Sequence, residues 1–86
     1  MPNPLPVYEY DVEVTEIDPV PSSRGDYCFE ATVSRLERLH TGTRQAVEPP
    51  KHLFWGKDAA EARKKAHAVI RSWIAEQGGI VVDSAS

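Results

Sequence analysis

The hydrophobic period of this chain changes near Gly56 from about two residues to about 3.6, and that change most constrains the fold. Before it, apolar and polar residues alternate, as they do in strands that bury one face. After it, apolar residues recur every three or four positions and form the continuous stripe of an amphipathic helix. The stripe consists of Ala59, Ala62, Ala66, Val69, Ile70 and Trp73.

Both ends of the predicted helix carry recognisable signals. Asp58 is placed to cap the first turn, and Glu61 follows three residues later in a capping-box arrangement. Gly78-Gly79 ends the helix, because glycine adopts the left-handed cap conformation at little cost. We therefore predict a single long helix after the strands.

Two alternating segments precede the helix and predict a pair of antiparallel strands. Residues 8–15 place Tyr and Val on one side and mainly acidic residues on the other. Residues 27–34 alternate in the same way, with Tyr, Phe, Ala and Val on one side and Cys, Glu, Thr and Ser on the other. The segment between them, residues 18–26, is rich in Pro, Ser, Gly and Asp and predicts a loop. Leu36 and Leu39 break the alternation, so we expect the second strand to bulge or end around Arg35.

Residues 43–55 predict a third strand at an edge of the sheet, formed as one strand or as two pieces. Pro49-Pro50 interrupts any hydrogen-bonded ladder there, since proline has no N–H group to donate. Phe54 and Trp55 are adjacent, so in a strand they point to opposite faces and one of them is less buried. An exposed aromatic side chain beside an open sheet edge suits a protein partner or a second copy of the chain.

Together these segments predict an α+β fold of order β-β-β-α, in which one long helix packs on one face of a three-stranded antiparallel sheet. A fourth strand forms if the tail joins the sheet. We expect a Pro-rich extended arm over residues 1–6, a single domain over 7–79 and a tail over 80–86 whose start, Ile80 to Val82, has strand character.

Composition excludes several classes of protein. Net charge is −3, and the acidic strand faces oppose nucleic acid or anionic lipid unless the cations gather on one surface. A single cysteine, Cys28, forms no internal disulfide, and the first residues lack the pattern of a signal peptide. No apolar run is long enough to span a membrane. We therefore expect a cytoplasmic protein that does not enter membranes.

The sequence gives little support for catalysis or for a metal or other cofactor. Cys28 and the histidines lack the closely spaced pairs typical of zinc sites, and no phosphate-binding glycine loop is present. No pair of carboxylates is placed for acid and base chemistry. Arg24-Gly25-Asp26 spells an integrin-binding tripeptide, but glycine followed by aspartate is also ordinary turn chemistry. We predict a noncatalytic protein without a cofactor.

The helix also carries a group of cations that form the alternative candidate site. On a helical wheel, Lys64, His67 and Arg71 lie within about 60° of one another. Such a face either contacts phosphates or is simply the solvated side of the helix. Strong nucleic-acid binders neutralise about 6–10 phosphates, more than this group offers. The full set of candidate residues for nucleic acid is Lys57, Lys64, Lys65, His67 and Arg71.

Parts of the sequence resemble known families. FEATV, followed by GKDAAEA and then SWI, is similar to the strand and helix of HicB-type antitoxins, and the resemblance implies a β-β-β-α core. The same segment resembles, less closely, the second half of a double-stranded RNA-binding domain. There Lys57, Lys64 and Lys65 would be the RNA-contacting lysines.

The function that the sequence favours is that of a small accessory or interaction domain, working through an unidentified protein partner or as a homo-oligomer. Phe54 and Trp55, with the neighbouring edge strand, are its candidate binding residues. The alternative is an RNA- or DNA-binding module that uses the basic face of the helix.

Overall fold

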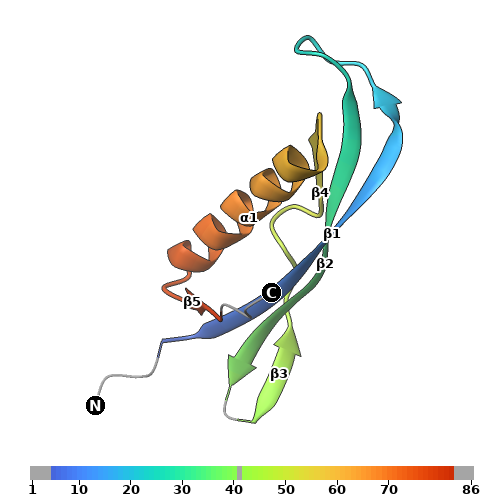
Figure 1. The fold of residues 1–86 in the computed structure, drawn as a ribbon. Helices are drawn as coiled ribbons and strands as arrows, with labels where there is room; N and C mark the ends of the chain where they lie inside the picture. Colours follow the sequence, from blue (N-terminus) through green and yellow to red (C-terminus); the bar gives the residue numbers. More distant parts are fainter. Residues whose placement is uncertain (1–4, 41, 83–86) are drawn as a thin grey trace.

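The computed structural model describes residues 5–40 and 42–82, which form one mixed five-stranded sheet with one helix packed on it (Figure 1). The α+β class and the packed helix are confirmed. The three-stranded antiparallel sheet is corrected, because the sheet has five strands and one of them is parallel to its neighbour. The elements are β1 (Val7–Val20), β2 (Tyr27–His40), β3 (Thr43–Ala46), β4 (Leu53–Gly56), α1 (Ala59–Glu76) and β5 (Ile80–Val81).

The long hairpin of β1 and β2 forms the centre of the sheet. Asp11 pairs with Arg35 but Val12 pairs with Val33, so Ser34 is an extra residue that forms a bulge in β2. The break predicted around Arg35 is therefore a bulge within a continuous strand. Because of the extra residue, both Val33 and Leu36 are buried.

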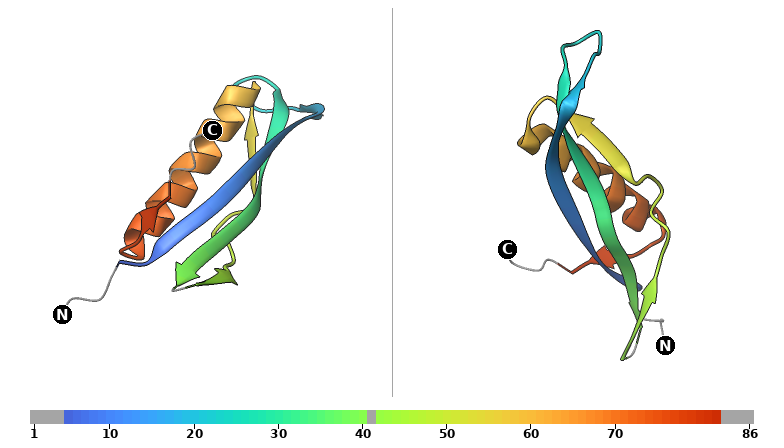
Figure 2. Two further views of the ribbon diagram at one scale, coloured as in Figure 1. Left: turned by 60° about the horizontal axis from the view of Figure 1, so that its bottom comes forward. Right: turned by 90° about the vertical axis from the view of Figure 1, so that its right-hand side faces the viewer.

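The hairpin is longer than the sequence indicates. β1 continues to Val20 through residues assigned to a loop, and the register shifts between Glu16 and Val20. Figures 1 and 2 show the end of this hairpin projecting beyond the helix. Pro19 lies in this end of β1, where β2 is the neighbour on one side only.

The predicted third strand is two pieces, β3 and β4, which both pair with β2. β3 lies against residues 37–40 and β4 against residues 29–32, so the two follow one another along the same edge of β2. Pro49-Pro50 lies between them, where a residue without an N–H group cannot continue the ladder.

The tail supplies the fifth strand. β5 runs parallel to β1, with hydrogen bonds from Ile80 N to Pro6 O and from Val82 N to Tyr8 O, each 2.9 Å long. The end of the Pro-rich arm is thus joined to the tail at this edge. Residues 1–4 of the arm and 83–86 of the tail lie outside the described residues.

The helix begins and ends where the sequence predicts. The Asp58 side chain accepts a hydrogen bond from Glu61 N at 2.7 Å, and Gly78 has the positive φ of 72° that ends the helix. The buried face is narrower than the predicted stripe: Val69 is 37% exposed, and Trp73 packs at the margin, edge-on to Tyr8. The helix residues that are buried are Ala62, Ala66, Ile70 and Ile74.

The core lies between this helix face and the inner face of the sheet. Its sheet residues are Tyr8, Tyr10, Ala31, Val33, Leu36 and Phe54. In the part of the chain that the structure describes, no helix combines the length and hydropathy needed to cross a membrane.

Gly56 sets the distance between the helix and β4. A Cβ atom added at Gly56 would lie 2.9 Å from Ala62 Cα, closer still to Ala62 N, and 3.0 Å from Asp58 O. These neighbours are backbone atoms, which cannot rotate away. The first turn of the helix therefore lies against β4 only because position 56 has no side chain.

We predict that Gly56→Ala lowers the free energy of unfolding by about 1–3 kcal/mol, because the added methyl forces the helix away from β4. Urea unfolding followed by circular dichroism measures the change. Ser72→Thr adds the same single methyl at an exposed helix position and should cost only a few tenths of a kcal/mol. Equal losses of unfolding free energy in Gly56→Ala and Ser72→Thr would contradict the close contact between the helix and β4.

Candidate functional site

The two candidate binding aromatics lie on opposite faces of β4, as predicted. Phe54 is 3% exposed and lies in the core, so it has little surface to offer a partner. Trp55 is 41% exposed, and its indole N–H donates to the Glu30 carboxylate at 3.2 Å. Of the pair, only Trp55 presents a surface, and its ring is held in place by the neighbouring strand.

A hollow of about 420 Å³ lies beside Trp55 at the free edge of β4. The Tyr27 ring lies 6.4 Å from the Trp55 ring, and Leu53, on the same strand as Trp55, is 45% exposed. We call this hollow the edge pocket. The residues that line it are Tyr27, Lys51, Leu53, Phe54, Trp55 and Lys65.

The outer edge of β4 has no neighbouring strand in the part of the chain that the structure describes. Among the described strands, β4 pairs with β2 alone. Val33 N donates to His52 O at 3.1 Å, and in an antiparallel ladder the hydrogen-bonded pairs alternate. Phe54 and Gly56 therefore point their backbone groups toward β2, while Leu53 and Trp55 point theirs outward.

Two lysines stand at the edge pocket. Lys65 Nζ donates to the Trp55 carbonyl oxygen at 2.8 Å, pairs with Glu61 at 3.1 Å and lies 4.8 Å from the centre of the Tyr27 ring. Lys51 Nζ lies 5.2 Å from the centre of the Phe54 ring. Lysine at a strand edge also discourages nonspecific pairing with other chains.

The structure does not gather the five basic candidates into one surface. Lys65 reaches the β4 edge, whereas His67 and Arg71 contact Tyr10 of β1 on the other side of the helix. Lys57 precedes the helix and lies near Gly25 of the hairpin turn. Lys64 is exposed on the helix.

His67 belongs to a half-buried cluster at the β1 side of the helix. Arg71 Nε donates to the Tyr10 hydroxyl at 3.2 Å, and that hydroxyl lies 2.5 Å from His67 Nδ1. With its oxygen accepting from Arg71, the hydroxyl donates its proton to a neutral imidazole. Burial, together with the charges of Arg71 and Arg63, lowers the pKa of His67 below its usual 6.5. At neutral pH, His67 adds no charge to a basic face.

We predict that acid destabilises the fold through His67. Because its pKa is lower in the folded chain, the unfolded chain binds the proton first as pH falls below about 6.5, and stability falls with it. The melting temperature measured between pH 7.5 and 5 should fall less in His67→Gln, which keeps an acceptor for Tyr10 but does not titrate. If the melting temperatures of His67→Gln and the parent fell by the same amount over this pH range, His67 would not be the group responsible.

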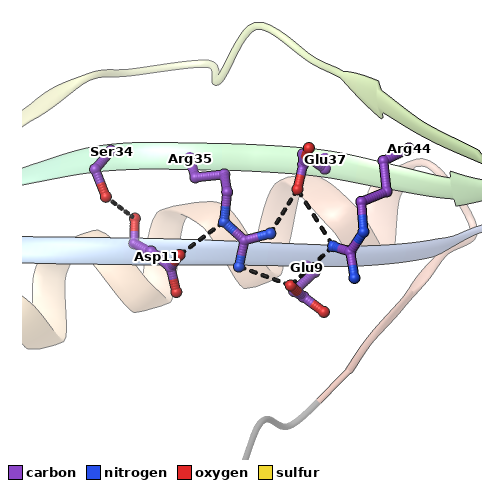
Figure 3. Close-up of polar contacts among 6 residues, drawn as sticks. All are labelled: Glu9, Asp11, Ser34, Arg35, Glu37 and Arg44. Carbon is purple, nitrogen blue, oxygen red and sulfur yellow. Dashed lines mark hydrogen bonds and ion pairs between the residues drawn. The ribbon is translucent and has the colours of Figure 1, made fainter.

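The outer face of the sheet carries a network of ion pairs that the sequence analysis missed (Figure 3). Arg35 contacts Glu9, Asp11 and Glu37 at 2.5–2.7 Å. Arg44 of β3 joins Glu9 and Glu37 at 3.1 and 3.4 Å. The acidic strand face expected to repel phosphates is therefore largely compensated at this end. The alternation of residues predicted that the carboxylates lie on one side of β1. Only the pairing register of the strands places Arg35 and Arg44 beside them.

We predict that Arg35→Gln lowers the melting temperature at pH 7 and low salt, because three carboxylates lose their shared partner. Hydrogen bonds from Arg35 and Arg44 lower the pKa of Glu9, so this stabilisation is present above about pH 4.5 and is lost as pH falls further. In thermal melts, the difference in melting temperature between the variant and the parent should therefore be smaller at pH 3 than at pH 7.

The control is Arg38→Gln, an exposed position on the same strand. It should have the smaller effect at pH 7, and a larger effect than that of Arg35→Gln would contradict the role given to the network.

The remaining sequence candidates lie at the hairpin end. Arg24, Gly25 and Asp26 are exposed in the turn, where Gly25 has a φ of 110° and the Ser22 hydroxyl contacts both Arg24 N and Gly25 O. Cys28 lies half-buried on β2. Across the described residues, no three His, Cys, Asp or Glu side chains gather as metal ligands.

Comparison with protein-family models, curated proteins and solved structures gives no match to this chain. The resemblances to HicB-type antitoxins and to double-stranded RNA-binding domains remain predictions from short motifs.

Proposed function

We propose that this protein is a small noncatalytic interaction domain of the cytoplasm, and that it binds a protein partner through the β4 edge. The observation that carries the proposal is the exposed Trp55 ring beside an unpaired strand edge. Aromatic side chains of this kind supply much of the binding energy in protein interfaces.

Three features of the edge support this function. Trp55 is held by Glu30 and its ring lies tilted beside the Tyr27 ring, so it presents a fixed surface that loses little freedom on binding. Leu53 extends the apolar surface along the strand. The outward backbone groups of both strand residues add directional hydrogen bonding, the means by which sheet edges recognise extended chains.

The nucleic-acid alternative has weaker support. Its candidate residues divide between the two sides of the helix: Lys65 faces the β4 edge, whereas His67 and Arg71 contact Tyr10. The pKa of His67 is lowered, so at neutral pH this residue adds no charge. The net charge of the chain is −3. A binding surface for phosphates needs concentrated positive charge.

The test is recovery of partners from native lysate by the tagged full chain, with and without nuclease. We expect a partner that survives nuclease and whose affinity, measured afterwards with the purified partner, falls about tenfold or more in Trp55→Ala. Val69→Ala removes a similarly exposed apolar side chain from the helix and is the matched control. It should leave the affinity unchanged.

Two results would contradict the proposal. Recovery that disappears with nuclease and falls steeply with salt would favour nucleic acid and direct mutation to Lys64 and Arg71. Partners that bind Trp55→Ala as well as the parent would exclude the β4 edge. Circular dichroism melts of each variant establish that the fold is intact.

A further inference from the structure

We propose that the β4 edge binds an extended segment of another protein in which acidic and apolar residues alternate, and that this segment adds to the sheet as a further strand. The inference rests on the proposed function and names the chemistry of the partner. It follows from the charges at the edge pocket, the phase of the β4 backbone and the alternation of side chains along a strand.

The charge of the edge pocket is opposite to that of the chain. Two of its six lining residues, Lys51 and Lys65, are cations, and none is a carboxylate. The nearby carboxylates of Glu61 and Glu30 are outside the lining and are engaged by Lys65 and by the Trp55 indole, respectively. The chain as a whole has a net charge of −3. A ligand with carboxylates at this position gains attraction from both ammonium groups, while a basic ligand meets like charge.

Both ammonium groups are close to aromatic walls. Lys51 stands over the Phe54 ring, and Lys65 stands over the Tyr27 ring while holding the Trp55 carbonyl. The side chain of Lys65 is 42% exposed. An incoming strand replaces Lys65 at the carbonyl with its own N–H group. The Lys65 ammonium, which keeps its pair with Glu61, then also pairs with a carboxylate of the ligand.

The alternation of β4 then assigns a pattern to the ligand. Leu53 and Trp55 face away from the helix, on the side opposite to the buried Phe54. In an added strand, residues beside Leu53 and Trp55 are best apolar, and those between them project toward Lys65. The preferred ligand is therefore a short extended segment in which apolar and acidic residues alternate.

A second copy of this chain is a poorer occupant. Its β1 has the required alternation, from Tyr8 to Val14, but those residues are already paired with β2. Joining the β1 edge of one copy to the β4 edge of another uses two different surfaces and leads to an open chain of subunits. Two β4 edges facing each other would bring their lysines together. A separate protein with a free segment meets neither obstacle.

The probe is a library of random linear peptides of about twelve residues, displayed on phage and selected on the immobilised full chain. We expect enriched peptides in which Asp or Glu alternates with apolar residues. Binding of a synthesised peptide, measured by fluorescence anisotropy, should weaken by about twofold to fivefold for each lysine in Lys51→Gln and Lys65→Gln. Lys64→Gln, one residue from Lys65, is the control and should bind as the parent does.

Two further measurements separate strand addition from simple charge attraction. Replacing Asp and Glu of the peptide by Asn and Gln should weaken binding to the parent but not to the double lysine variant, as a double-mutant cycle requires. Hydrogen exchange followed by NMR should show the Leu53 and Trp55 amides slowed by the peptide. The amides of Glu9 to Glu16 should exchange as before.

The outcomes are distinguishable. No enrichment, enrichment of basic peptides, or unchanged affinity in both lysine variants would overturn the proposed ligand. Concentration-dependent self-association in sedimentation, lost in Trp55→Ala, would replace it with a second copy. A lysate partner that requires Trp55 but not the lysines would leave the proposed function standing and exclude this ligand class. A lysate partner that binds Trp55→Ala as tightly as the parent would exclude both the proposed function and this ligand class.

Discussion

The close approach of the helix to β4 is the constraint on which the rest of the structure depends. Gly56 and Ala62 allow the backbones to meet, and the small Ala66 one turn later continues the contact. Ile70 and Ile74, the largest fully buried side chains among the described residues, fill the core farther along the helix. Because only one helix is present in the described chain, it covers one face of the sheet and leaves the other to water.

The two faces of the sheet are therefore stabilised by different interactions. The inner face is apolar and is completed by the helix, whereas the outer face is covered by charges that neutralise one another around Arg35. Exposed ion pairs of this kind add little stability individually, but they keep an open sheet face hydrated. The edge pocket is separate from this network, since none of its lining residues belongs to the ion pairs around Arg35.

The helix contact also positions the candidate site. Lys65 follows Ala62 by three residues, so the turn that lies against Gly56 places the Lys65 ammonium at the Trp55 carbonyl. The same turn brings Lys65 over the Tyr27 ring, at the start of β2. The edge pocket is thus built by β4, by the helix that directly follows it and by the start of β2, which lies farther away in the sequence.

The sequence by itself determined the elements whose signals are local. Alternation gave the inner and outer sides of β1 and β2, capping residues gave the ends of the helix, and adjacency placed Phe54 and Trp55 on opposite faces. Pairing partners were decided only by the tertiary structure. The parallel β5, the two-piece edge along β2 and the Arg35 network depend on register between distant segments, which no local pattern contains. For the same reason, the helical wheel grouped His67 with the exposed cations, although burial and the charges of Arg71 and Arg63 lower its pKa in the folded chain.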